Sequence, residues 1–385
     1  MMRPMKLAGS ELMFGQGCLD YIKTLPYKRV SIVIGGASMQ KSGMLDKITG
    51  LFKEAGADVQ VITGVEPDPS IATVRRGRDE MLTFGPDLIV GLGGGSAMDA
   101  AKTMWVFYEH PELNTMADIL PPNPFPKLRA KARFACIPST SGSASEVSRS
   151  VVITDDSGMK RGLGNMEMMP DIAIVAPEVC VSMPKRVTAE TGMDALTHAL
   201  EAMVSNRVNY VADTLARRAA RDIIAVLPQA VANGEDLAAR ETMANASMSA
   251  GMAFTNVSLG IVHSIAQTLG SYFHISHGLA DAIVLPYIIE YNSGAPYAKA
   301  IYDSFAAEIG VDSLADKVRE LNASLGIPAT LKEALPDEEK FLEVIDAMAA
   351  MSKADGCTKT NPIIPTVPEF RELILKCYYG KEVQA

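Results

Sequence analysis

The sequence predicts two domains, an N-terminal α/β domain built on a doubly wound, Rossmann-like parallel sheet and a C-terminal all-α domain. The chain has 385 residues, whereas a single hydrophobic core stops growing at roughly 250–300 residues. Up to about residue 184, β-branched runs alternate with amphipathic stretches, and beyond it Ala, Met and Leu recur at helical spacing without clear strands. We therefore place the domains at residues 1–183 and 184–385.

Composition narrows the class of function. Hydrophobic residues make up 48% of the chain, enough for a packed core, and no run of about 18 apolar residues predicts a membrane helix. A net charge of −9 disfavours nucleic acid and anionic membranes as partners, because both would repel it. The five cysteines are spread without a CxxC pair, which predicts a reducing, cytoplasmic setting and no disulfides. A small-molecule enzyme fits these features.

The first domain is predicted from an alternating series of segments. A β-branched run over residues 29–35 (RVSIVIG) indicates a buried parallel strand, and residues 44–56 then have a helical pattern. A second strand is expected over residues 57–65, a helix over 71–84, and a third strand over 87–91 before another helix. This β-α-β-α-β-α order is typical of a doubly wound sheet.

A glycine turn follows the third strand of this series and opens a helix. Backbone without side chains at such a turn lets amide groups approach a pyrophosphate. The alternative is a tight strand-to-helix turn without a ligand. The residues concerned are Gly93, Gly94, Gly95 and Ser96.

A second polar turn is expected after the strand that begins at residue 133. Its hydroxyl groups and small side chains suit a phosphate or ribose, although a polar loop that caps a helix would look the same. The hydroxyl-bearing residues are Ser139, Thr140, Ser141 and Ser143.

Four metal-binding side chains lie in two short blocks of the second domain. Asp194 and His198 are four residues apart, so they share one face of a helix. His263 stands in an apolar helical pattern, and His277 is expected in a short loop. One carboxylate and three imidazoles suit Fe(II) or Zn(II). Two alternatives stay open, namely histidines that are hydrogen-bonded core residues and an ion that only staples helices together.

Four motifs carry a resemblance to a known family: GGGSAMDAAK, IPSTSGSASEVS, MPKRVTAETGMDALTHALEA and GIVHSIAQTLGSYFHISHG. In this order, within a similarity that runs from near residue 8 to about residue 376, they resemble the iron-containing (group III) alcohol dehydrogenases. The resemblance implies a nucleotide-binding domain facing an all-helical domain, with an ion held by Asp194, His198, His263 and His277. It implies hydride transfer between NAD(P)(H) and a small primary alcohol or aldehyde, with Fe(II), or alternatively Zn(II), polarising the substrate oxygen.

The resemblance also predicts which residues bind each part of the cofactor. The pyrophosphate is expected on residues 93–96 and the nicotinamide end near Ser139, Thr140 and Lys160; Asp99, in the first motif, joins the cofactor-binding candidates. Many relatives have an aspartate after the first strand, where this chain has Gly36. Without that carboxylate, a 2′-phosphate has room.

Two neighbours of Gly36 could bind that phosphate: Ser38 could donate a hydrogen bond and Lys41 could supply charge. We therefore expect NADP(H) to be preferred over NAD(H), unless the glycines only tighten a turn.

Other positions depart from the family pattern. Many relatives have a second histidine where this chain has Gln267, and glutamine cannot exchange a proton near neutral pH. His274 could supply the proton route, or could be a surface residue. A common Asp-Pro is Ala176-Pro177 here, and nothing in the sequence shows what compensates.

A dehydroquinate-synthase-like lyase, which also combines a nicotinamide with a metal, is the alternative function, but few basic residues flank the metal motifs. We also expect a homodimer or larger homo-oligomer from the resemblance, with the N-terminal strand as a natural pairing edge.

Overall fold

The structure is a computed structural model that describes residues 5–380, and it divides into two compact units. The first unit runs to Pro184 and includes Gly234–Met248, and the second comprises Lys185–Asn233 and the chain from Ser249 onward. The sequence placed residues 234–248 in the helical domain. The difference arises because the division falls inside one continuous helix, α8 (Leu237–Val257), whose composition does not change at that point.

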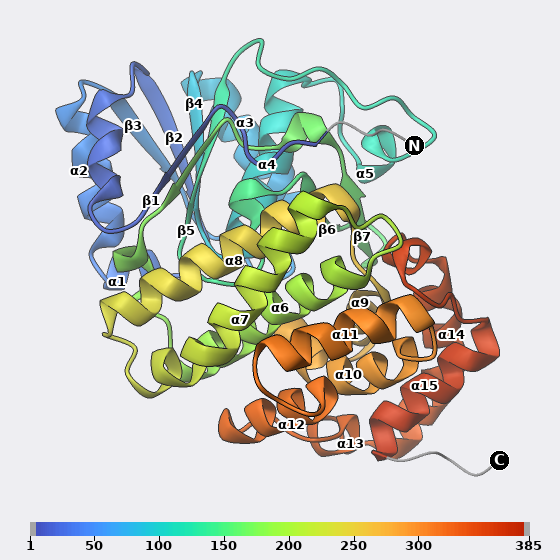
Figure 1. The fold of residues 1–385 in the computed structure, drawn as a ribbon. Helices are drawn as coiled ribbons and strands as arrows, with labels where there is room; N and C mark the ends of the chain where they lie inside the picture. Colours follow the sequence, from blue (N-terminus) through green and yellow to red (C-terminus); the bar gives the residue numbers. More distant parts are fainter. Residues whose placement is uncertain (1–4, 381–385) are drawn as a thin grey trace. The chain divides into compact units, whose positions relative to one another are not determined.

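A six-stranded parallel sheet forms the centre of the first unit, which confirms the predicted fold class (Figure 1). Its strand order is β1-β8-β5-β4-β2-β3. The chain therefore passes from β2 to β3 on one side and from β3 back to β4 on the other side of β2. The strands are β1 (Glu11–Phe14), β2 (Arg29–Ile34), β3 (Asp58–Ile62), β4 (Leu88–Gly93), β5 (Arg133–Pro138) and β8 (Ile172–Val175).

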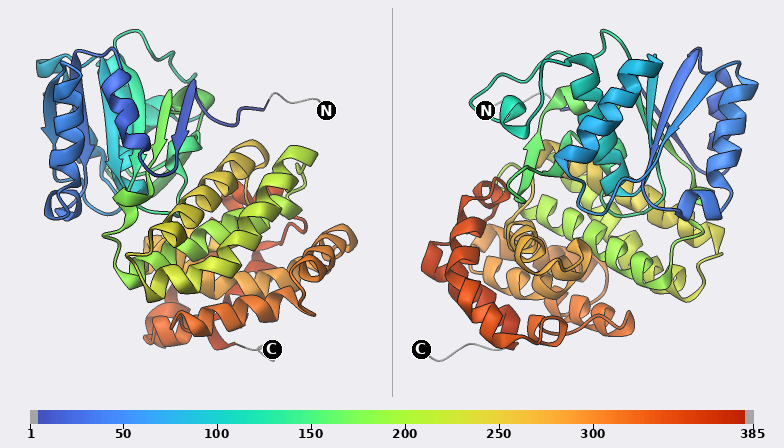
Figure 2. Two further views of the ribbon diagram at one scale, coloured as in Figure 1. Left: turned by 60° about the vertical axis from the view of Figure 1, so that its left-hand side comes forward. Right: turned by 180° about the vertical axis from the view of Figure 1, so that it is seen from behind.

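Helices cover both faces of this sheet (Figure 2). Successive side chains of a strand point to opposite faces, so the apolar strands of this sheet need cover on both sides. Ile32 of β2 belongs to the same hydrophobic cluster as Phe52 of α2, whereas Val33 belongs to a second cluster with Val74 of α3 and Met104 of α4. The α-helices of this part are α1 (Ser38–Lys41), α2 (Met44–Glu54), α3 (Ile71–Phe84), α4 (Gly95–Glu109) and α5 (Met116–Ile119); the short 3-10 helices are η1 (Cys18–Thr24), η2 (Ser145–Val147), η3 (Met166–Met168) and η4 (Pro177–Cys180).

An antiparallel hairpin of β6 (Ser150–Thr154) and β7 (Lys160–Gly164) follows the second polar turn and is separate from the main sheet. The buried ammonium of Lys102 donates to the carbonyl oxygens of Ser148, at 2.9 Å, and Ser150, at 3.2 Å. Helix α4, which begins at the glycine turn, therefore also holds the start of the hairpin.

The second unit contains helices and no strand among its described residues. Helix α6 packs against α7 and α10, and nearly all its residues from Thr188 onward are buried. Its elements, besides the end of α8, are α6 (Lys185–Val204), α7 (Tyr210–Ala232), α9 (Ile261–Phe273), α10 (His277–Asn292), α11 (Pro296–Glu308), α12 (Leu314–Ser324), α13 (Leu331–Ala334), α14 (Glu338–Ala354), η5 (Cys357–Thr360) and α15 (Val367–Tyr379). Within residues 5–380, no helix combines the length and apolar character needed to cross a membrane.

Candidate metal centre and nucleotide-binding turns

Helix α6 presents two of the expected metal ligands one turn apart. Oδ1 of Asp194 lies 3.4 Å from Nε2 of His198, and both side chains are at least 90% buried. Their spacing of four residues places them on one face of the helix, as the sequence predicted. This face provides one side of a cluster of donor atoms.

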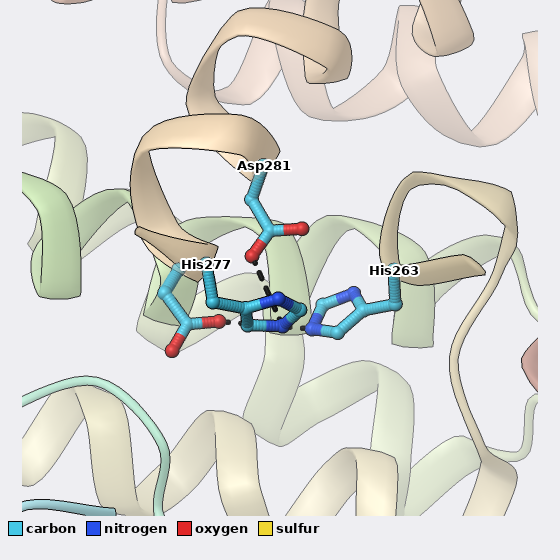
Figure 3. Close-up of side chains that lie close together, drawn as sticks. His263, His277 and Asp281 are labelled. Atoms are coloured by element: carbon cyan, nitrogen blue, oxygen red, sulfur yellow. Dashed lines mark ion pairs between the residues drawn. The ribbon is translucent and has the colours of Figure 1, made fainter. Parts of the chain in front are cut away.

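Helices α9 and α10 supply the remaining donors. His263 lies in the first turn of α9, and its Nε2 is 3.6 Å from Oδ1 of Asp194. His277 is the first residue of α10 and not part of a loop, because Ser276 already takes the N-cap position. One turn further along α10, Oδ2 of Asp281 lies 3.3 Å from Nε2 of His277. Figure 3 shows His263, His277 and Asp281 pointing toward one another.

The donor atoms have the arrangement expected of a cation site. One atom each from Asp194, His263, His277 and Asp281 lies within 4.8 Å of the others. Oδ1 of Asp194, Nε2 of His263 and both carboxylate oxygens of Asp281 are buried without a hydrogen-bond partner. Leaving such atoms unsatisfied costs free energy, and a bound divalent cation would satisfy them together. The residues present therefore fit a metal ion with mixed nitrogen and oxygen ligands.

The electrostatics of the cluster also favour a cation. Burial acts to raise the pKa of Asp194, but the neighbouring imidazoles of His198, His263 and His277 outweigh it and lower that pKa below its ordinary value. Burial raises the pKa of Asp281 well above its ordinary value, and the nearby carboxylates of Asp194 and Glu201 add to this. One carboxylate is thus held ionised, while the other gains its charge most readily beside a cation.

Glu201 orients His263 and was not among the sequence-based candidates. It is buried, it lies 2.7 Å from Nδ1 of His263, and it accepts backbone N–H groups of Gly260 and Val262 at 2.9 and 2.7 Å. With Nδ1 engaged, Nε2 is the nitrogen available to an ion. The sequence signal for Glu201 was its position seven residues after Asp194. The signal for Asp281 was its spacing of four residues from His277.

His198 has a different environment from the other imidazoles. Its ring stacks on His263, with centroids 4.7 Å apart, and on Phe254, at 4.4 Å. It is not among the four residues whose donor atoms converge within 4.8 Å. The expected ligand set and the observed cluster therefore share three residues and differ in the fourth, His198 or Asp281.

The two candidates for substrate or proton contacts lie on α9. Gln267 is half-buried one turn after His263, whereas His274 is exposed at the C-cap with φ of 54°. Neither is part of the donor cluster.

In the first unit, the glycine turn and the second polar turn lie against each other. A Cβ on Gly94 would meet Thr140 at 3.3 Å, and one on Gly95 would meet Ser143 at 3.1 Å. The N–H of Ser139 also donates to the carbonyl of Gly93 at 2.9 Å. Larger side chains would crowd this surface, where α4 presents its N-terminal amides, so the geometry suits a phosphate group.

The turn after β2 is open to solvent. Gly36, Ser38 and Lys41 are all exposed, and a Cβ on Gly36 would meet nothing within 4 Å. The glycine is therefore not required by packing. Because β3 and β4 lie on opposite sides of β2, the carboxyl ends of β2 and β4 form the point where the strand order reverses, which is where doubly wound sheets bind nucleotides.

Two other cofactor candidates have protein partners. Lys160 forms an ion pair with Asp68 at 2.8 Å. The carboxylate of Asp99 accepts from the hydroxyl of Ser145 at 2.8 Å and from the N–H of Val152 at 2.9 Å. Asp99 thus anchors η2 and the hairpin through its carboxylate.

A parallel-sheet unit with a phosphate-type turn and a helical unit with a cluster of metal-donor side chains are the two parts expected of an oxidoreductase that combines a nucleotide with a metal ion. Residues 9–177 match the iron-containing alcohol dehydrogenase model, and residues 188–378 match the C-terminal model of the Fe-containing alcohol dehydrogenase family. The chain belongs to the iron-containing alcohol dehydrogenase family. It is an oxidoreductase of the NAD(P)-dependent alcohol dehydrogenase class, which favours the dehydrogenase over the lyase alternative.

Individual relatives agree with this assignment. An NADPH-dependent butanol dehydrogenase of Clostridium saccharobutylicum is 44% identical over 97% of both chains. A 1-propanol dehydrogenase of Salmonella typhimurium is 37% identical over 95% of this chain and 97% of its own. Among solved structures, an iron-containing alcohol dehydrogenase from Thermococcus thioreducens is 35% identical, with a TM-score of 0.92 over 98% of this chain and 100% of that one.

Proposed function

We propose that this chain is an iron-dependent dehydrogenase of small primary alcohols, which also reduces the corresponding aldehydes and prefers NADP(H). The observation that carries the proposal is the convergence of donor atoms of Asp194, His263, His277 and Asp281, of which those of Asp194, His263 and Asp281 are buried without a hydrogen-bond partner. The cofactor and substrate class are supported by the Clostridium relative, which is an NADPH-dependent butanol dehydrogenase.

Asp194, His263 and His277 would hold the ion, with His198 or Asp281 as a fourth ligand. When bound, a divalent ion supplies a Lewis acid that polarises the substrate oxygen. The family favours iron, and the same mixed donor set also accepts zinc.

The side chains around the cluster would keep its donors aligned and place the substrate. Glu201 holds Nδ1 of His263 and so keeps Nε2 directed toward Asp194. Gln267 could orient a substrate or a water by hydrogen bonds but could not exchange its proton near neutral pH. His274, exposed at the end of α9, is our candidate for exchange of the proton with solvent.

The nicotinamide cofactor, which supplies or accepts the hydride, would bind to turns of the first unit. The amide groups of residues 93–96 would hold its pyrophosphate at the N-terminus of α4. The open turn with Gly36, Ser38 and Lys41 would accept the 2′-phosphate. Ser139, Thr140 and Lys160 would lie toward the nicotinamide end.

Reduced-nicotinamide absorbance tests the proposal. The iron-loaded protein should oxidise NADPH faster than NADH in the presence of butyraldehyde, and His263→Ala should abolish the reaction and the bound iron. Faster NADH oxidation would contradict the NADP(H) assignment. No oxidation of either cofactor over a panel of small aldehydes would contradict the proposed function.

A comparison of two variants tests which side chain is the fourth ligand. His198→Ala and Asp281→Asn are compared by iron content after dialysis against a chelator. The variant that loses more iron identifies the side chain that coordinates more strongly.

A further inference from the structure

Ser276 joins the beginning of α10 to α6. It occupies the N-cap of α10, where a serine hydroxyl ordinarily accepts a backbone N–H of the first turn, yet its side chain makes no such bond. Its hydroxyl instead donates to Oε2 of Glu190 at 2.6 Å, across 86 residues of sequence. The serine therefore gives up local capping for a contact between helices.

The backbone of α10 also lies directly on α6 at this point. A Cβ on Gly278 would sit 2.1 Å from the carbonyl oxygen of Glu190 and 3.3 Å from Cβ of Asp194. Glu190 thus meets the first turn of α10 through its main chain as well as its carboxylate. His277 lies between the two contact points, Ser276 and Gly278.

Helix α6 arranges its functional side chains along one face. Glu190, Asp194, His198 and Glu201 follow at intervals of four, four and three residues. Glu201 holds His263 directly, and Glu190 holds the residue before His277. Helix α6 therefore contacts the first turns of both α9 and α10, through Glu201 and Glu190 respectively.

His277 has the greater need for such support. Its side chain is 41% exposed, whereas that of His263 is 3% exposed and enclosed by packing. Glu190 also forms an ion pair with Arg186 at 2.5 Å. This pair contributes little to holding His277, because the arginine side chain is 75% exposed and solvent weakens such pairs.

We propose that Glu190 is a positioning residue for the metal centre, which fixes His277 for coordination through its hydrogen bond to Ser276. The inference rests on the proposed function, in that it takes the cluster to bind a divalent ion. Residues that orient metal ligands commonly change metal affinity by about 10- to 100-fold when they are removed.

The test measures Co²⁺ affinity of metal-free protein by competition with a chelator, together with the Co²⁺ absorption spectrum. Glu190→Ala and Ser276→Ala should each weaken binding by about 10-fold and alter the spectrum. The double variant should bind no more weakly than either single variant, because both remove one interaction. Glu190→Gln, whose carbonyl still accepts the serine hydroxyl, should restore most of the affinity.

Thr191→Ala is the matched control, because its hydroxyl only bonds the carbonyl of Val187 within α6. It should bind Co²⁺ like the wild type. Wild-type affinity and spectrum in Glu190→Ala, or additive losses in the double variant, would overturn the positioning role. If Glu190→Ala fails to fold, Ser276→Ala alone decides, since its hydroxyl makes no capping bond. A wild-type protein that binds no Co²⁺ would instead overturn the metal centre of the proposed function.

Discussion

At the scale of single residues, the metal centre depends on which side-chain atoms already have partners. Nδ1 of His263 is engaged by Glu201 at 2.7 Å, whereas its Nε2 has no hydrogen-bond partner. Both oxygens of the fully buried Asp281 also lack one. Buried polar atoms without partners cost folding free energy, so the protein without a bound ion is less stable because these proposed ligand atoms have no hydrogen-bond partner.

Replacing Gly36 by aspartate should reverse the cofactor preference. A carboxylate at this exposed turn would repel a 2′-phosphate and could accept hydrogen bonds from the ribose hydroxyls of NAD(H). A Cβ meets nothing within 4 Å there, so the fold should tolerate the change. We expect kcat/KM for NADPH to fall at least about 10-fold, a loss of about 1.4 kcal/mol in transition-state stabilisation, while that for NADH is kept or raised.

Lys41→Ala provides the companion measurement. It should weaken NADPH use and leave NADH use unchanged, because only the phosphate needs the positive charge. Equal losses with both cofactors in either variant would show that this turn does not bind the 2′-phosphate.

A second residue-scale prediction concerns pH and stability. Burial raises the pKa of Glu146 to about 7 from an ordinary value of 4.5. Between these values the folded protein retains a proton that the unfolded chain has lost, so this carboxyl group makes the protein less stable as pH rises from about 4.5 to 7. Glu146→Gln should remove that part of the pH dependence.

The check compares thermal unfolding midpoints of the wild type and Glu146→Gln at pH 5 and pH 8. From pH 5 to pH 8, the free energy of unfolding of the variant should rise by about 1–3 kcal/mol relative to that of the wild type, because each pKa unit corresponds to about 1.4 kcal/mol. Parallel pH profiles would contradict a protonated, buried Glu146.

Sequence spacing could identify only part of the metal cluster. Asp194 and His198 were predictable because both lie on one helix, where a spacing of four residues fixes a shared face. Asp281 and Glu201 have comparable helical spacings, but many helix carboxylates do, and most face solvent. What distinguishes these two is the packing of α6, α9 and α10 against one another, which depends on contacts between residues far apart in the chain.

At the scale of elements, α9 begins without a cap of its own. Gly260 occupies the N-cap and has no side chain to accept the first N–H groups. Glu201 of α6 accepts those of Gly260 and Val262 instead. One buried carboxylate therefore satisfies the end of α9 and orients His263, the proposed ligand in its first turn. The proposed metal site would thus be coupled to the stability of this helix.

Glu201→Ala should consequently affect both properties. Removing one partner from a buried charged network costs about 3–5 kcal/mol, and we expect the metal-free protein to be destabilised to that extent. Zn²⁺ affinity should also fall by about 10- to 100-fold. Thermal unfolding without metal and Zn²⁺ titration measure the two effects separately.

Glu308→Ala serves as the control, because its ion pairs with Arg217 and Arg221 lie at the surface. It should change stability by at most about 1 kcal/mol. Unchanged Zn²⁺ affinity in Glu201→Ala would show that His263 is oriented by packing alone.

The regular elements of the first unit were largely predictable, and its short ones were not. The β-branched run of β2 and the amphipathic pattern of α3 define their structures locally, and both lie where the sequence placed them. Strand β7 (KRGLG) has little strand character of its own and forms by pairing with β6. The start of α10 at His277 was missed because its N-cap serine bonds another helix.

At the scale of the whole molecule, the proposed metal site and the proposed nucleotide site belong to different compact units. Asp194, His263, His277 and Asp281 all lie in the second unit, whereas the glycine turn and the turn after β2 lie in the first. Each unit has its own buried hydrophobic residues. All residues of the donor cluster come from the second unit, and all residues of the two turns come from the first. Metal and nucleotide should therefore stabilise different parts of the chain.

Hydrogen exchange can resolve this division. A ligand that binds only the folded state stabilises it by about 2.7 kcal/mol at 100 times its Kd, and local opening reports where that stabilisation acts. Zn²⁺ should slow exchange in α6, α9 and the first turns of α10, while NADP⁺ should slow it around residues 36–41 and 93–99. In His263→Ala the Zn²⁺ protection should be lost and the NADP⁺ protection kept. If NADP⁺ protected only helices of the second unit, or if its protection vanished in His263→Ala, the nucleotide site would not be formed by the turns of the first unit alone.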